Sequence, residues 1–223
     1  MQKIVRQNES ESRNKRYSAT IDKNICEQLE KEVRRINMTV EEKIYEEVKR
    51  RCELPSNAYG IGAWDHHIKI VYELAKKNAS EYGANQEIVS LAALLHDVAS
   101  VTDVTYTEEH HIIGTKIAEE LLLQENYPIE KIEQIKKCIL NHRGSRLASK
   151  NSPEEICIAD SDAMAHFYSI PSLLSMVYRE KNLSIDEGSK FVMEKLERSY
   201  NKMSAKGKKL VKKQYESAKN ILK

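Results

Sequence analysis

The chain has 223 residues, of which 31% are charged, 40% hydrophobic and 6% aromatic, and its formal net charge is +2. This composition fits one globular domain with appendages or two small domains. Seven glycines and four prolines leave little turn chemistry for a many-stranded sandwich or barrel, which excludes an all-β fold. No apolar run approaches the roughly 20 residues of a membrane span, and the first residues lack the apolar stretch of a signal peptide. We therefore expect a cytoplasmic protein without a membrane partner.

Charge and histidine are unevenly distributed along the chain. Residues 53–200 carry 23 acidic and 15 basic residues, whereas residues 201–223 carry eight basic residues and one acidic residue. All seven histidines lie between positions 66 and 166, within the acidic part. The four cysteines form no CxxC pair and no zinc-like spacing, so we expect reduced thiols. The middle of the chain is where the chemistry of the protein is to be sought.

The amino-terminal part is predicted to contain a disordered tail, a strand and two helices. Residues 1–15 are polar and lack periodic apolar positions, which is typical of disorder. In residues 16–22 apolar and polar side chains alternate as in a strand, and residues 25–36 carry apolar side chains at helical spacing. Thr39 and Glu42 make the capping box of a second helix.

This order of one strand and two helices, over residues 16–52, resembles a ribbon-helix-helix module. Such modules pair two strands across a dimer and lay the ribbon in the major groove of DNA. The resemblance implies a homodimer that binds nucleic acid, with Arg16, Ser18 and Thr20 facing the bases. The alternative is a pair of helices that packs on the rest of the chain and could also make a dimer.

Residues 53–63 hold a proline and two glycines and are typical of a linker, so we place the domain boundary there. Apolar residues at helical spacing then predict a series of helices. These cover residues 66–82, 87–97, 108–126, 153–169, 171–181, 186–199 and 203–221, with a further helix beginning at Pro128. The predicted fold is therefore all-α, a helical bundle with a small N-terminal extension and a C-terminal basic helix.

The most informative segment is the end of the apolar run 87–97, where His96 and Asp97 are adjacent. A buried polar side chain needs a partner, and imidazole and carboxylate are ordinary ligands of divalent cations. Two consecutive residues can reach one ion only where a helix ends, and Ser100 and Thr102 indicate such an ending. We therefore expect a pair of metal ligands here.

Other His and Asp residues lie on the apolar faces or at the ends of separate predicted helices. They are His66 with His67, His110, His142, and Asp160 with Asp162. His67 lies on the buried face of its helix and His66 lies beside it. A bundle that turned these faces inward would build a metal site in its core.

These segments, in this order, resemble the HD domain, a family of metal-dependent phosphohydrolases named for an adjacent His-Asp pair. The resemblance covers roughly residues 60–170 and rests on HHIKIVYELA, LAALLHDVAS, EHHIIGTKIAEELL, ILNHRGS and IADSDAMAHF. It implies an HD-domain helical bundle, which we place over residues 53–200. By the family pattern, the ligands of the first metal are His67, His96, Asp97 and Asp162. His110 and His142 would complete a second metal site or contact the substrate phosphate.

Two ligand positions have a second candidate. Met164 supplies the apolar residue that the motif has two positions after its last Asp, which favours Asp162 over Asp160. The first ligand is His67 or, as the alternative, its neighbour His66.

The chain departs from the family pattern in the residues that bind phosphate. Ile70 stands where an Arg is often found, and the Lys that often follows the His-Asp pair is absent. Lys69 and Arg143 are therefore the candidates for binding the substrate phosphate. His111 and His166 are expected to be structural or surface residues.

The resemblance implies hydrolysis of a phosphate ester, a nucleotide or a related phosphomonoester or phosphodiester, by metal-activated water. The catalytic residues would be His96, Asp97, His110 and His142. One or two divalent ions are implied, and the ligand types admit Mn, Fe, Co, Ni, Zn or Mg. One alternative is a DNA-binding regulator whose HD bundle senses a nucleotide or a metal without turnover. Another is a relic that binds metal without activity, against which the complete ligand set argues.

Residues 201–223 allow two interpretations. The lysines could form a basic patch for nucleic acid or anionic lipid. The segment also carries the apolar face of an ordinary amphipathic helix, made by Leu210, Val211, Tyr215, Ala218 and Leu222. We favour a basic amphipathic helix with a solvated lysine face.

The ribbon-helix-helix interpretation predicts DNA binding that weakens as the salt concentration rises, because the phosphate contacts release counterions. Arg16→Ala should abolish this binding if Arg16 reaches the duplex. Fluorescence anisotropy of a labelled duplex at two salt concentrations measures both effects. Affinity that is equal in wild type and variant would argue for the packed-helix alternative.

Overall fold

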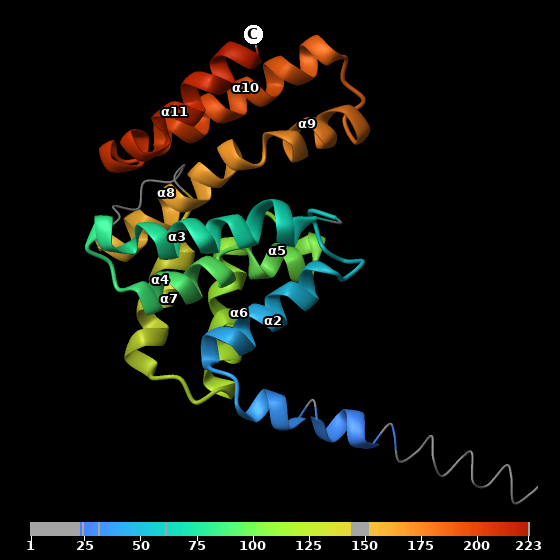
Figure 1. Ribbon diagram of the computed structural model, residues 1–223, viewed down its shortest axis with the longest axis vertical. Coiled ribbons are helices and arrows are strands. Elements are labelled where there is room, and N and C mark those ends of the chain that lie inside the picture. Colours follow the sequence, from blue (N-terminus) through green and yellow to red (C-terminus); the bar gives the residue numbers. More distant parts are fainter. Residues whose placement is uncertain (1–22, 24, 31, 61, 144–151, 223) are drawn as a thin grey trace, which may run out of the picture. The chain divides into compact units, whose positions relative to one another are not determined.

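The computed structural model describes residues 23, 25–30, 32–60, 62–143 and 152–222, and all regular elements within these ranges are helical. The predicted all-α class is therefore confirmed. The helices are α2 (Val40–Cys52), α3 (Lys69–Tyr82), α4 (Gln86–Leu95), α5 (Val98–Thr102), α6 (His110–Gln124), α7 (Ile129–Asn141), α8 (Pro153–Tyr168), α9 (Ile170–Arg179), α10 (Ile185–Lys202) and α11 (Ala205–Ile221) (Figure 1). A π-helical turn, Trp64–Ile68, leads directly into α3. No helix in the described ranges combines the length and the apolar character that crossing a membrane requires.

The chain divides into two compact units, residues 1–43 and 44–223. The sequence placed this boundary within residues 53–63, but the second unit begins at Ile44. The reason is burial: Ile44, Val48 and Cys52 on α2 are at most 6% exposed, so this helix packs as part of the bundle.

The first unit contains the predicted helix, whose described residues are helical up to position 36. Its apolar side chains are 48–76% exposed, and they are Ile25, Leu29, Val33 and Ile36. The predicted capping box is present, since the backbone N–H of Glu42 donates to Thr39 Oγ1 at 3.2 Å and that of Thr39 donates to Glu42 Oε2 at 2.8 Å. The predicted tail, the strand, and Arg16, Ser18 and Thr20 lie outside the described residues.

The core of the second unit is built by α3, α4, α6, α7 and α8. Helix α3 packs on α4 and α8, α4 packs on α7, and α6 packs on α5 and α7. The side chains that fill the space between them are fully buried, among them Ile68, Ile88, Leu91, Leu94, Leu95, Ile132, Ile135, Ile139, Ile158 and Met164. Burying these side chains stabilises the fold by roughly 1.5–3 kcal/mol each, and it fixes the directions of the helix ends that carry the polar residues.

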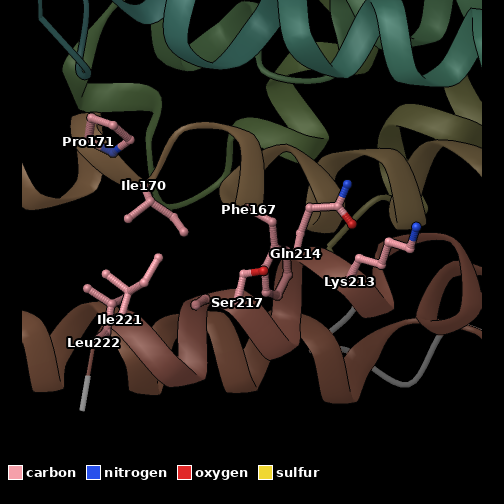
Figure 2. A pocket seen from close by; sticks show the side chains of 9 residues that line it. Phe167, Ile170, Pro171, Lys213, Gln214, Ser217, Ile221 and Leu222 are labelled. Atoms are coloured by element: carbon pink, nitrogen blue, oxygen red, sulfur yellow. The ribbon is translucent and has the colours of Figure 1, made fainter.

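The carboxy-terminal helices continue the same unit. Helix α10 packs on α8, α9 and α11, and α11 also packs on α8. The predicted basic helix is thus an integral element, because Val211, Ala218 and Leu222 are buried on its apolar face. An apolar pocket lies between this helix and the start of α9, lined by Phe167, Ile170, Pro171, Lys213, Gln214, Ser217, Ala218, Ile221 and Leu222 (Figure 2). None of the predicted site residues lines this pocket.

A buried carboxylate on α8 fixes the start of α11. The backbone N–H of Ser204, the N-cap residue, donates to Asp160 Oδ1 at 3.0 Å, and its hydroxyl donates to Asp160 Oδ2. The hydroxyl of Tyr82 donates to the same Oδ2 at 2.7 Å. A Cβ at Gly207 would lie 2.5 Å from Asp160 Oδ2. Position 207 therefore needs glycine for space, because three donors hold the carboxylate in place.

We expect Gly207→Ala to lower the free energy of unfolding by about 1–3 kcal/mol, the usual cost of overpacking. The higher helix propensity of alanine offsets part of this loss. Gly114→Ala is the matched control, since its nearest neighbour, Ile139 Cγ2, would lie at 3.4 Å, an ordinary contact. Urea titration of both variants measures the effect, and equal stability of Gly207→Ala and wild type would contradict this account of Asp160.

Candidate metal centre

Six side chains that the sequence singled out converge in the core of the bundle. They form two groups, each with its candidate ligand atoms within 4.8 Å of one another: His67, His96 and Asp162 in one, and Asp97, His110 and His142 in the other. They come from the π-helical turn, the end of α4, the start of α6, the end of α7 and the middle of α8. Residues far apart in the sequence are thus brought to one place.

The first group is organised around His67. Its Nε2 lies 3.2 Å from His96 Nε2 and 3.4 Å from Asp162 Oδ1. His96 is fully buried, whereas His67 is partly exposed. The group therefore has a buried side and a side that solvent can reach.

The second group shares the carboxylate of Asp97 with the first. His110 Nε2 lies 3.3 Å from Asp97 Oδ1 and 3.2 Å from His142 Nε2. The other carboxylate oxygen, Oδ2, lies 3.5 Å from the Nε2 atoms of both His67 and His96. Asp97 thus turns one oxygen toward each group.

Local interruptions of helical geometry bring these side chains into position. Helix α4 ends at Leu95, and Asp97 adopts φ −112° and ψ 17°, between α4 and α5. This break lets the adjacent His96 and Asp97 face the same centre, as the sequence predicted. His67 lies in the π-helical turn, and such turns often occur at functional sites because they change the direction of a side chain.

Backbone carbonyls fix the orientation of three imidazole rings. The Nδ1 atom of His96 lies 2.8 Å from Ala93 O, that of His110 lies 2.7 Å from Thr107 O, and that of His142 lies 2.6 Å from Ile139 O. A carbonyl oxygen only accepts hydrogen bonds, so each Nδ1 carries the proton. Each neutral ring consequently presents the lone pair of Nε2 to the centre, as in metal-ligating histidines whose second nitrogen is held by the protein.

The two lone pairs of His110 and His142 point at each other across 3.2 Å. Two acceptors at this distance repel each other unless a proton lies between them or a metal ion lies beside them. Asp97 Oδ1 is a third acceptor at the same point, 3.3 Å from His110 Nε2 and 3.7 Å from His142 Nε2. Imidazole nitrogen and carboxylate oxygen together suit divalent transition metals. The residues present therefore fit a divalent ion.

The electrostatic environment keeps the carboxylates ionised. Burial opposes ionisation of Asp97, but His96, His142 and His67 hold its pKa well below the usual value. Burial likewise opposes ionisation of Asp162, and Lys202 is the first of the cations that lower its pKa. Both side chains are therefore available as anionic ligands at neutral pH.

Two buried histidines differ in their tendency to accept a proton. Burial lowers the pKa of His96 to about 4, so this ring is neutral at pH 7. Burial opposes protonation of His142 as well, but Asp97 raises its pKa above the usual value. In the absence of a metal, a proton on His142 thus relieves the opposed lone pairs of the second group.

The geometry distinguishes between the two candidates at each of the two uncertain ligand positions. Asp162 faces His67, whereas Asp160 binds Ser204 and Tyr82 and belongs to the anchor of α11. His66 is exposed, its ring lies beside Gly62, and it belongs to neither group. The structure therefore brings Asp162 and His67 into the cluster and leaves their alternatives outside it.

The two residues predicted to bind phosphate are not in the cluster. The Arg143 side chain donates from Nη1 to the carbonyl oxygen of Glu108 at 3.1 Å. Lys69, the first residue of α3, is half-buried and makes no hydrogen bond or ion pair with the described residues. Their role as phosphate ligands stays a prediction.

Three side chains near the centre were not assigned to it from the sequence. Lys202 Nζ lies 3.3 Å from Asp162 Oδ2. His166 stacks on His67, with ring centroids 5.6 Å apart, and its Nδ1 lies 3.0 Å from Ser199 Oγ. Tyr59 meets His67 edge to face, with ring centroids 6.4 Å apart. His166 follows Asp162 by one helical turn, which was a usable signal, but no local pattern marks Lys202 or Tyr59.

Comparisons with known proteins give a family and two partial relatives. Residues 64–166 match the model of the HD domain family. A ribonuclease Y from Petrotoga mobilis is 32% identical over 108 residues, which are 48% of this chain and 19% of the relative. An uncharacterised protein from Clostridium beijerinckii is 36% identical over 64 residues, 29% of this chain and 41% of that protein. The chain thus spans less than half the length of either relative, and no solved structure matches it.

The partial burial of His166 predicts a pH dependence of stability. Burial, followed by the charge of Lys195, lowers its pKa to about 3, whereas a histidine in an unfolded chain titrates near pH 6.5. The unfolded state therefore binds the extra proton first, and stability is full above about pH 6.5 and falls as the pH decreases toward 4. In metal-free protein, His166→Gln should remove on the order of 2 kcal/mol of this loss.

Thermal denaturation between pH 4 and 7, after treatment with a chelator, measures the slope. The exposed His66 provides the control, because His66→Gln should leave the wild-type slope unchanged. Identical slopes for wild type and His166→Gln would show that His166 is protonated as readily in the folded as in the unfolded protein.

Proposed function

Since residues 64–166 form an HD domain of the metal-dependent phosphohydrolase superfamily, we propose that this protein hydrolyses a phosphate ester at the centre made by its six His and Asp side chains. The observation that carries the proposal is the pair of opposed Nε2 lone pairs on His110 and His142, 3.2 Å apart beside the carboxylate of Asp97. Such an arrangement is stabilised by a cation. A purely structural core would place a donor opposite each acceptor.

The two groups would hold one divalent ion each. His67, His96 and Asp162 would bind the first, and His110 and His142 the second, with Asp97 offering one oxygen to each. A divalent ion supplies Lewis acidity, which polarises a phosphoryl oxygen and makes water a better nucleophile at neutral pH. His96, Asp97, His110 and His142 act in this proposal by holding the ions and so the reacting groups in place.

Other residues of the chain position these ligands. The carbonyls of Ala93, Thr107 and Ile139 hold three imidazole rings through their Nδ1 protons. Lys202 holds one oxygen of Asp162 and leaves the other toward His67. Partners of this kind orient metal ligands and typically contribute 10–100-fold to metal affinity or activity.

The substrate class proposed is a phosphorylated small molecule, with a nucleotide favoured. Two divalent ions suit the anionic oxygens of a phosphoryl group. The name of the Petrotoga relative, a ribonuclease, adds the phosphodiester of RNA to the candidates. The substrates to be compared are therefore nucleoside phosphates, a generic phosphomonoester, a generic phosphodiester and a short RNA.

The direct test compares wild type with Asp97→Ala. Elemental analysis of the purified proteins should find a divalent metal in wild type and a large decrease in the variant, because Asp97 serves both groups. Turnover of the four substrate classes with added Mn²⁺ should fall at least about 100-fold, as expected when a ligand that orients the reacting groups is lost.

Asp186→Ala is the matched control, since Asp186 is an exposed carboxylate in the first turn of α10. This variant should keep the metal content and turnover of wild type. A wild-type protein that retains no divalent metal and shows no metal-stimulated turnover would overturn the proposal.

A further inference from the structure

Helix α10 turns one face toward the candidate metal centre. Lys195, Ser199 and Lys202 recur at intervals of four and three residues, which places them on the same face of a helix. Ser199 Oγ lies 3.0 Å from His166 Nδ1, and Lys202 Nζ lies 3.3 Å from Asp162 Oδ2. Two of the three positions thus contact the face of α8 that carries Asp162 and His166.

The third position, Lys195, lies at the same face without a partner. Among the described residues it makes no hydrogen bond and no ion pair, although it is half-buried. The charge of Lys195 lowers the pKa of His166, and the charges of Asp162 and Asp97 act to raise the pKa of Lys195. Burial lowers the pKa of Lys195, and the charges of Asp162 and Asp97 offset this effect only in part.

A half-buried ammonium group without an acceptor is costly unless a ligand supplies one. Asp162 meets Lys202 through Oδ2 and faces His67 through Oδ1, and no hydrogen bond or ion pair joins it to Lys195 in the structure. An anionic ligand bound at this face would supply an acceptor and offset the charge of the ammonium group.

We propose that Lys195 binds the phosphate group of the substrate beside the metal centre. The inference rests on the proposed function and deepens it, since it names the side chain that recognises the phosphoryl oxygens. Lys202 is a positioning residue for Asp162, and Ser199 positions His166. The resulting subsite accepts an anionic phosphoryl group through a charge-assisted hydrogen bond from the Lys195 ammonium.

The subsite comes from a part of the chain that the family match does not cover. The match ends at residue 166, whereas α10 spans Ile185–Lys202. The guanidinium of Arg143, which the sequence suggested for this task, donates to the carbonyl of Glu108 instead. The carboxy-terminal helices would thus add phosphate recognition to a centre whose ligands all lie in the matched segment.

Inorganic phosphate is the probe for the test. Its affinity for the Mn²⁺-loaded full chain is measured by isothermal titration calorimetry for wild type, Lys195→Gln, Lys195→Arg and Lys190→Gln. Lys195→Gln should weaken phosphate binding about tenfold or more, the usual effect of losing one hydrogen bond from a charged group. Lys195→Arg should restore most of the affinity, and Lys190→Gln should leave it unchanged because Lys190 is exposed on α10.

Measurements of metal content and thermal stability for each variant show whether Lys195 binds phosphate or has a structural role. Lys195→Gln should keep the wild-type metal content and fold. Unchanged phosphate affinity in Lys195→Gln, absence of phosphate binding by wild type, or a loss of metal that accompanies the loss of affinity would each overturn the phosphate subsite.

Failure of the phosphate subsite can be distinguished from failure of the proposed function. A wild type with metal and turnover, combined with full phosphate affinity in Lys195→Gln, overturns the subsite alone. A wild type without metal or turnover overturns the function itself.

Discussion

The carboxylate of Asp97, buried between two sets of imidazole nitrogens, is the interaction on which the arrangement of this bundle depends. An anion in a core of isoleucine and leucine is unfavourable unless a proton or a metal ion held by the neighbouring imidazoles offsets its charge. Here one carboxylate oxygen faces His67 and His96, and the other faces His110 and His142. The helix ends that carry these residues must meet at one point, and the apolar packing of α3, α4, α7 and α8 brings them there.

The way in which the histidines are held explains why the centre is suited to a cation. In His96, His110 and His142, the Nδ1 proton is bound by the carbonyl oxygen three residues earlier. This contact uses a carbonyl that the helix end or turn leaves without a helical partner, so local backbone geometry decides the tautomer. The Nε2 lone pairs are consequently directed inward before any ion binds, and little reorganisation is needed when one does.

Two carboxylates on helix α8 have different roles, one structural and one at the candidate metal centre. Asp160 receives hydrogen bonds from Ser204 and Tyr82 and holds α11 in place, whereas Asp162 faces His67 and Lys202. Two residues apart on a helix point in directions about 200° apart, so both can be buried while they serve different neighbours. The carboxy-terminal helices thereby contribute both to the stability of the bundle and to the electrostatics of the centre.

The sequence by itself determined the helical class, the order of the elements, and six His and Asp residues that the structure brings together. Helical periodicity and the rule that buried polar groups need partners are local properties, so residues such as His96 and Asp97 could be identified without coordinates. The tertiary structure decided what depends on packing between distant segments. It placed Asp162 and not Asp160 in the cluster, joined α2 to the bundle from Ile44 onward, and brought Lys195 and Lys202 of α10 beside α8. No local pattern records these contacts, because periodicity specifies the buried face of a helix but not the helix that covers it.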